Sequence, residues 1–206
     1  MTGNYRQGKI SMERNFHERY IVNISESAFL QMILSALEAY CVHHKINKNY
    51  GKHCETYGIV WGSEGLTCDG IKFFNIELVS IDTSVERSSC WCIEDDESFQ
   101  LKNDFITSFY PRYEFLGDFH THPYKSKKPK IVHKNKLYNF SKSDITTVND
   151  KEFYNHKYRI GIVLAITCTR KSTNKISPFP GGVEFSLNNY RLFLNAQVFC
   201  ASQVVG

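Results

Sequence analysis

The chain has 206 residues, of which 42% are apolar, a composition that supports one domain with a sizeable core and excludes a disordered protein. Its net charge of +4 is too small to select a nucleic-acid or membrane partner by itself. No run approaches the roughly 18 apolar residues of a membrane span, and the polar lead-in 1–19 has no signal-peptide core. We therefore expect a cytoplasmic protein with one domain, 20–206, and no membrane partner.

Seven cysteines are present, an odd number, and no two of them form a Cys-x-x-Cys pair. A chain of this size needs no disulfides for stability, so the pattern favours the reduced thiols of an intracellular protein. Cys90 and Cys92 flank a tryptophan and could bind a metal or pair with another group. Because no second close pair accompanies them, ordinary loop residues are the simpler interpretation.

The first half of the chain predicts a strand, a helix and two paired strands. The apolar run 21–24 reads as a short strand. Ser25 is a good N-cap, and apolar residues then recur at helical spacing, which predicts a helix over about 26–43. The β-rich runs 57–61 and 71–81 are separated by a glycine-containing turn, so we expect them to pair.

The second half predicts a helix over 98–109, a strand over 113–119 and a further helix that opens near Ser141. Four acidic residues at 94–97 suit the positive end of the first of these helices, with a metal cluster as the alternative. Residues 158–169 form the most continuous apolar run, which is typical of a central strand. The chain ends in two strands, or in a strand and a helix, over 183–185 and 190–199. These elements indicate an α/β protein with a single mixed β-sheet flanked by helices.

Two histidines separated by one residue follow the strand 113–119. Alternate side chains of a strand point to the same face, so His120 and His122 would present both imidazoles to one side. Neutral imidazoles are common zinc ligands, and a catalytic zinc takes three protein ligands and keeps one position open. On their own the two residues also fit an ordinary polar strand end, which Pro123 would terminate. The neighbouring Asp118 is assigned no catalytic role.

Ser141 and Asp144 lie three residues apart at the start of the expected helix, a spacing that puts both side chains on one face. Asp144 is therefore a candidate for the third metal ligand. The same Ser-x-x-Asp pattern is close to a capping box, with Phe140 and Ile145 in the positions of a hydrophobic staple. Ser141 can cap the helix and still face a site, whereas we expect Asp144 not to serve both purposes fully.

Glu55 stands just before the β-rich run 57–62 and completes an ordered set of residues. The order Glu, His-x-His-Pro, Ser-x-x-Asp resembles the JAMM motif of the MPN-domain zinc metalloproteases. The resemblance extends over about residues 20–200 and implies the MPN fold, which is similar to that of cytidine deaminases. Its specificity lies in the motif residues Glu55, His120, His122, Ser141 and Asp144.

The resemblance implies a role for each motif residue. His120, His122 and Asp144 would hold Zn2+, and a zinc-activated water would attack the scissile amide. Glu55 would act as general base and then as general acid, and Ser141 would hydrogen-bond the oxyanion. The family also implies a deubiquitinase-like peptidase or isopeptidase that cleaves after the C-terminal tail of ubiquitin or a ubiquitin-like protein. The sequence leaves open the modifier, the kind of bond, the oligomeric state and any activating partner.

Two features depart from the family pattern. The spacer between His122 and Ser141 holds 18 residues, longer than the usual short stretch. The glutamate is followed by Thr-Tyr-Gly, where many members have x-Gly-Gly. The added spacer is basic, and it could shape the substrate groove, dock an acidic partner or form a solvated loop. Its charged residues are Lys125, Lys127, Lys128, Lys130, Lys134 and Lys136, with His133 among them.

Two other functions stay open beside hydrolysis: a non-catalytic MPN scaffold in a multiprotein assembly, and a DNA-repair-associated relative of the same fold. Scaffold members usually lack several motif residues, whereas this chain lacks none. The basic spacer could contact phosphates, but no interleaving of aromatic and basic residues indicates a nucleic-acid module. A zinc deaminase is set aside, because its His-x-Glu and Pro-Cys-x-x-Cys motifs are missing.

Overall fold

The computed structural model shows a mixed α/β protein. The described residues are 19–46, 49–84, 86–88, 92–93, 96–125, 127–145, 157–170, 172 and 174–200. The lead-in up to residue 18, Cys90 and the first two of the acidic residues at 94–97 lie outside them. Among the described helices, none has the length and apolar character needed to cross a membrane.

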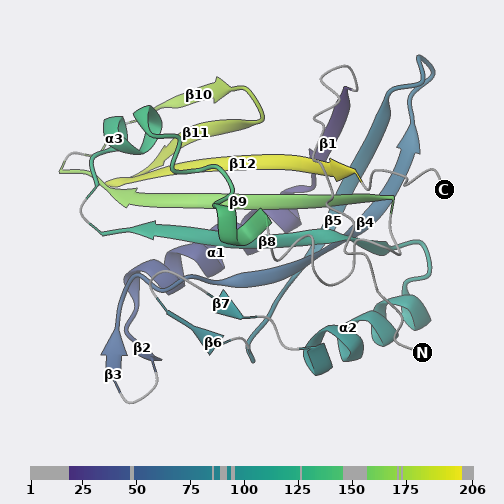
Figure 1. Ribbon diagram of the computed structural model, residues 1–206, viewed down its shortest axis with the longest axis horizontal. Helices are drawn as coiled ribbons and strands as arrows, with labels where there is room; N and C mark the ends of the chain where they lie inside the picture. The colour runs from purple at the N-terminus through teal and green to yellow at the C-terminus, as the bar shows by residue number, and fades with distance from the viewer. Residues whose placement is uncertain are drawn as a thin grey trace, which may run out of the picture.

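One eight-stranded sheet organises the molecule (Figure 1). Its strands are β1 (Tyr20–Ile24), β4 (Tyr57–Leu66), β5 (Lys72–Ile81), β8 (Glu114–Tyr124), β9 (Tyr158–Cys168), β10 (Ile176–Phe179), β11 (Gly182–Leu187) and β12 (Tyr190–Cys200). They lie in the order β1-β5-β4-β8-β9-β12-β11-β10. The pairs β1–β5 and β8–β9 are parallel and the others antiparallel, so the main sheet is mixed as expected.

Two short two-stranded sheets, which the sequence does not predict, lie beside the main one. One pairs β2 (His44–Ile46) with β3 (Asn49–Gly51), and the other pairs β6 (Glu86–Arg87) with β7 (Cys92–Ile93). All four strands are only two or three residues long, too short to show the alternation that reveals a strand.

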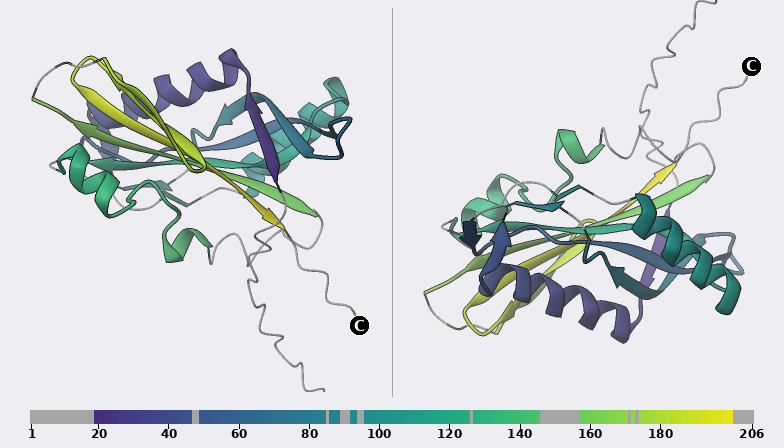
Figure 2. Two further views of the ribbon diagram at one scale, coloured as in Figure 1. Left: turned by 90° about the horizontal axis from the view of Figure 1, so that it is seen from above. Right: turned by 90° about the horizontal axis from the view of Figure 1, so that it is seen from below.

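Helix α1 (Glu26–Cys41) covers one face of the main sheet (Figure 2). Its start is fixed as expected, because Ser25 Oγ accepts a hydrogen bond from the backbone N–H of Ala28 at 3.3 Å. Met32 and Ala36 are buried on the side of α1 that packs against the central strands. The helix ends two residues earlier than expected, because Val42 has extended backbone dihedrals.

The opposite face carries α2 (Asp96–Phe109) and α3 (Pro129–Lys134). Helix α2 packs through Ile106 against apolar side chains of β4 and β8, and α3 packs through Val132 against β9 and β12. The sequence predicts α2 but only a loop in place of α3. A six-residue helix has little stability of its own, so the burial of Val132 accounts for it.

Strand β9 is central, as its continuous apolar run predicts. Ile162 and Leu164 belong to the core cluster beneath α1, whereas Val163 and Ala165 pack on the opposite face. Because both faces of β9 are covered, the strand shows no apolar–polar alternation. The last expected elements are both strands rather than a strand and a helix, and β10 is an additional strand that the sequence does not predict.

Strand β8 runs through the histidine pair instead of ending before it. It continues to Tyr124, and Pro123 pairs in register with Ile166 of β9. The expectation of a strand that ends at residue 119 and is stopped by proline is therefore wrong. Regular pairing with β4 stops at His120, so among the described strands β9 alone pairs with the last part of β8. A residue without a backbone N–H is tolerated at such an edge.

Candidate metal centre

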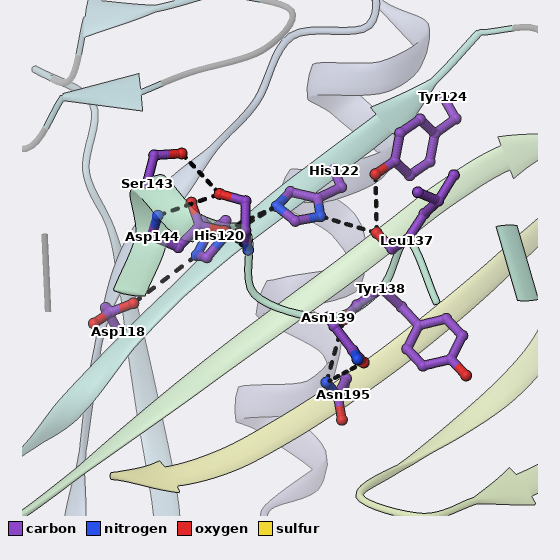
Figure 3. A network of polar contacts seen from close by, with 11 residues as sticks. Asp118, His120, His122, Tyr124, Leu137, Tyr138, Asn139, Ser143, Asp144 and Asn195 are labelled. Carbon is purple, nitrogen blue, oxygen red and sulfur yellow. Dashed lines mark hydrogen bonds and ion pairs between the residues drawn. The ribbon is translucent and has the colours of Figure 1, made fainter. Parts of the chain in front are cut away.

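His120, His122 and Asp144 converge on one point, and they can hold a metal ion (Figure 3). The two histidines project from the same face of β8, and Asp144 comes from a helical turn at 142–145. Nε2 of His120 lies 3.2 Å from Nε2 of His122. Oδ2 of Asp144 lies 3.5 Å from each of these nitrogens. Within the described residues this is the one such group of possible metal ligands.

The triangle formed by these atoms fits a tetrahedral metal ion. Ligand atoms bound at about 2.0–2.1 Å in tetrahedral geometry are about 3.3–3.4 Å apart. The observed separations of 3.2 and 3.5 Å bracket that value. Two imidazoles and one carboxylate are the possible ligands among the described residues, and three protein ligands are the number that a catalytic zinc typically takes.

His122 is oriented by a backbone carbonyl on the far side of its ring. Its Nδ1 lies 3.1 Å from the carbonyl oxygen of Leu137, which also accepts a hydrogen bond from the Tyr124 hydroxyl at 2.9 Å. A carbonyl only accepts, so this contact favours the tautomer with the proton on Nδ1, in which the lone pair of Nε2 can bind a metal. The segment after β8 thus sets the tautomer that a metal ligand needs.

The charged groups of the centre shift one another's ionisation. Burial alone lowers the pKa of His120, but the carboxylates of Asp118 and Asp144 outweigh it and raise this pKa to about 9. Burial alone raises the pKa of Asp144, but contacts with His120 and His122 hold it well below its usual range. A metal ion that binds here displaces a proton from His120, so metal binding depends on pH.

Ser141 and Asp144 form the capping box that their spacing predicts. Ser141 Oγ accepts from the backbone N–H of Asp144 at 3.2 Å, and the backbone N–H of Ser141 donates to Asp144 Oδ2 at 2.5 Å. Phe140 and Ile145 pack in one cluster, as a hydrophobic staple requires. The cap leaves Asp144 within reach of both histidines, although the sequence predicts that it does not serve fully both as cap and as metal ligand. The oxygen that accepts from Ser141 is also the one that faces His120 and His122.

Glu55 is buried immediately before β4, with 9% of its surface exposed. The register of β4 and β8 pairs Tyr57 with His120, and the backbones of Thr56 and Thr121 continue it through a 3.1 Å hydrogen bond. This register brings Glu55 beside the histidine pair. Burial raises the pKa of Glu55 to about 7, although the charges of His122 and His120 act in the opposite direction.

Asp118 belongs to the centre, although the sequence interpretation assigned it no role. Its Oδ1 lies 3.9 Å from Nδ1 of His120, the ring nitrogen on the side away from Asp144. The spacing of Asp118 and His120 already indicates this placement. Residues two apart on a strand share a face, so the argument that unites His120 with His122 applies equally to Asp118.

The six lysines of the spacer lie on residues 125–136, which we call the lysine segment. All six are exposed, and none forms an ion pair with a carboxylate of the described residues. No acidic residue occurs between Asp118 and Asp144. Val132 packs the segment against β9 and β12, and the carbonyl of Leu137, which follows the segment, contacts His122 of the metal centre.

The structure therefore brings His120, His122 and Asp144 together and sets Glu55 and Ser141 beside them. Cys92 lies on β7, and its partner Cys90 in the expected Cys-Trp-Cys loop is outside the described residues. Comparison of the chain with protein-family models finds no match, and comparison with curated proteins finds no significant match. The function is accordingly argued from the site itself.

Proposed function

We propose that this protein is a zinc-dependent metallopeptidase of the JAMM type, with an MPN-like fold, which hydrolyses amide bonds. The convergence of two imidazole nitrogens and one carboxylate oxygen within 3.5 Å of one another carries the proposal. This donor set suits zinc, whose ligands are nitrogen, sulfur and carboxylate oxygen in tetrahedral geometry. A buried carboxylate beside the triangle, Glu55, supplies the base that hydrolysis requires.

The residues around the triangle have distinct tasks in such a reaction. Zinc, when bound by His120, His122 and Asp144, supplies Lewis acidity and makes water nucleophilic near neutral pH. Glu55 accepts a proton from the attacking water as the oxygen bonds to the carbonyl carbon. When the carbon–nitrogen bond breaks, Glu55 returns that proton to the leaving nitrogen, so the products are a carboxylate and an amine.

Ser141 is suited to stabilise the carbonyl oxygen as negative charge develops on it. Its hydroxyl is fixed by the backbone N–H of Asp144 and by a 2.7 Å contact with the hydroxyl of Ser143. A fixed donor needs little reorganisation during the reaction, and loss of one such donor typically costs about 3–4 kcal/mol of transition-state stabilisation. We therefore assign Ser141 to the oxyanion.

For the substrate we propose the C-terminal tail of ubiquitin or of a ubiquitin-like protein, joined to another protein by a peptide or isopeptide bond. The lysine segment favours a protein substrate that carries acidic residues, because its six lysines are exposed and form no ion pair with a carboxylate of the described residues. The described cysteines Cys41, Cys68, Cys168 and Cys200 are free thiols, which agrees with the cytoplasmic location that we propose.

Metal analysis and one substitution test the proposal. The purified protein should contain about one zinc per chain, as the three-ligand site requires. Glu55→Gln should retain the zinc and lose hydrolysis of ubiquitin fusions, whereas His122→Ala should lose both. A protein that binds no zinc at neutral pH refutes the metal centre. A zinc-loaded protein that cleaves no ubiquitin-like fusion refutes only the substrate.

The lysine segment also supports a second candidate, a nucleic-acid-binding relative of the same fold. Six exposed ammonium groups can neutralise phosphates, and binding of this kind weakens steeply with salt. A gel shift with single-stranded and duplex DNA at two salt concentrations decides the matter. Salt-sensitive binding that is tighter than the binding of acidic peptides would favour this candidate over the peptidase.

A further inference from the structure

A buried ion pair lies directly behind one of the metal ligands. Asp118 on β8 and Arg159 on β9 are 5% and 6% exposed. Arg159 donates to Asp118 Oδ2 twice, from Nε at 3.0 Å and from a terminal nitrogen at 2.7 Å. The guanidinium also lies 5.6 Å from the centroid of the Phe115 ring. The carboxylate is therefore held in one orientation by a rigid donor group.

Burial of the Asp118–Arg159 pair lowers the stability of the fold through the desolvation of both charges. Two charges removed from water lose several kcal/mol of solvation each, and buried ion pairs can often be replaced by apolar residues without loss of stability. The pair also leaves one carboxylate oxygen unused by Arg159. That oxygen, Oδ1, faces Nδ1 of His120 at 3.9 Å, which is an ion-pair distance rather than a hydrogen bond.

The two histidines use their ring nitrogens in the same way. In each, Nε2 points into the metal centre and Nδ1 points toward an oxygen held by the protein. For His122 that oxygen is the Leu137 carbonyl, and for His120 it is Asp118 Oδ1. Within the described residues, Nδ1 of His120 has no other oxygen or nitrogen partner. Outer partners of this kind fix the tautomer and the ring orientation of a metal-binding histidine.

We propose that Asp118, clamped by Arg159, is a positioning residue for the metal ligand His120. Its carboxylate keeps the proton of the imidazole on Nδ1 and aims Nε2 at Asp144 and His122. Arg159 acts one step further out, because it holds Asp118 Oδ2 and leaves Oδ1 for the histidine. This inference rests on the proposed metal binding and adds two residues that lie outside the JAMM motif.

Zinc affinity of the full-length apo protein, measured by competition with a chromophoric chelator, tests the inference. Asp118→Asn preserves the size of the side chain and removes its charge. The double variant Asp118→Ala/Arg159→Met removes both charges, so that no unpaired arginine is buried. Both should bind zinc about 10–100 times more weakly than the natural chain, the usual effect of losing an outer partner of a metal-binding histidine. Arg159→Lys keeps the positive charge but cannot donate two hydrogen bonds to Asp118 from a planar group. Its zinc affinity should lie between that of the natural chain and that of the Asp118 variants.

Glu184 offers a matched control. Its buried carboxylate pairs with the buried Arg191 at 3.3 Å and with the exposed Lys175 at 2.9 Å, and neither partner is a metal ligand. Glu184→Gln should lower the melting temperature and leave the zinc affinity unchanged. A merely structural role for Asp118 predicts the same behaviour for Asp118→Asn, so affinity and melting temperature must be measured together.

A spectroscopic measurement reports on His120 itself. In the zinc-loaded protein, NMR of 15N-labelled histidine should show a slowly exchanging Nδ1–H on His120, and the double variant should lose that protection. If the natural chain binds no zinc, the proposed function fails together with this inference. If it binds zinc and Asp118→Asn and Arg159→Lys both bind equally well, only the positioning role is overturned. These single variants decide the question even if the double variant does not fold.

Discussion

Gly161 of β9 couples the core to the metal centre, and its replacement by alanine tests that coupling. A Cβ at this position would lie 2.4 Å from Cζ and 2.6 Å from Cε1 of Phe140, and 2.9 Å from Cε2 of Phe199. Carbon atoms in ordinary contact are about 3.5–4.0 Å apart, so the Phe140 ring must move by roughly 1 Å. Phe140 directly precedes Ser141, and its ring meets that of His120 edge-on with the centroids 5.6 Å apart.

We expect Gly161→Ala to lower the free energy of unfolding by about 1–3 kcal/mol, the usual effect of overpacking a filled core. In a chain of this length that corresponds to a melting temperature lower by about 2–12 °C. Zinc binding should weaken as well, because displacement of the Phe140 ring would shift His120, which it contacts, and Ser141, which follows it in the chain. Urea unfolding of the apo protein measures the first effect, and chelator competition measures the second.

Gly70→Ala is the control for the backbone. Gly70 has φ +77°, and an added Cβ would meet nothing within 4 Å. This variant should lose stability only through its left-handed backbone, by about 1–2 kcal/mol, and should keep its zinc affinity. A Gly161→Ala protein with unchanged stability refutes the tight packing of Phe140. Lower stability with unchanged zinc affinity refutes the coupling alone.

Zinc at 100 times its dissociation constant should raise the free energy of unfolding by about 2.7 kcal/mol, and a melting temperature that zinc and chelator do not change contradicts the site. Burial alone raises the pKa of the Asp82 carboxyl, but hydrogen bonds from Ser84 and Ser98 outweigh it and hold the pKa below its usual value. The resulting stability is present above the unfolded pKa of about 3.9 and is lost as the pH falls through the lower folded pKa. Asp82→Asn should therefore flatten the pH dependence of urea unfolding below about pH 4, and an unchanged pH profile would contradict this assignment. The double variant Lys128→Glu/Lys130→Glu should keep zinc binding but cleave acidic substrates more slowly, most clearly at low salt. Lys157→Glu, outside the lysine segment, should cleave them at the natural rate. Equal rates for the natural chain and both variants would show that the lysine segment takes no part in substrate binding.

The sequence predicts the parts of this protein whose cause is local. Ser25 caps α1 as expected, because the cap depends only on a side chain and a backbone N–H three residues later. The histidine pair shares a face, because the period of a strand is fixed by its backbone geometry. The capping box at Ser141 follows from its own four residues in the same way.

The parts that the sequence does not predict depend on distant residues. Helix α3 exists because Val132 packs against Ala165 and Phe193, which are more than 30 positions away in the chain. Strand β8 passes through Pro123 because β9 supports it from one side. The position of Asp144 is harder to predict, because its Oδ2 accepts from Ser141 and also faces two histidine nitrogens, and a carboxylate oxygen can accept from two directions.

The capping box also supplies a candidate metal ligand, and this has a consequence for the unfolded chain. A metal ion held by His122 and Asp144 ties together two points that are 22 residues apart in the sequence. Like a covalent cross-link, such a tie reduces the freedom of the open chain, and for a loop of this length the reduction is worth about 3 kcal/mol. The loop so closed contains the lysine segment, whose like charges repel one another and favour expansion. A bound ion would therefore hold the loop between His122 and Asp144 closed against the repulsion of its lysines. Removal of the ion should destabilise this loop before the rest of the fold.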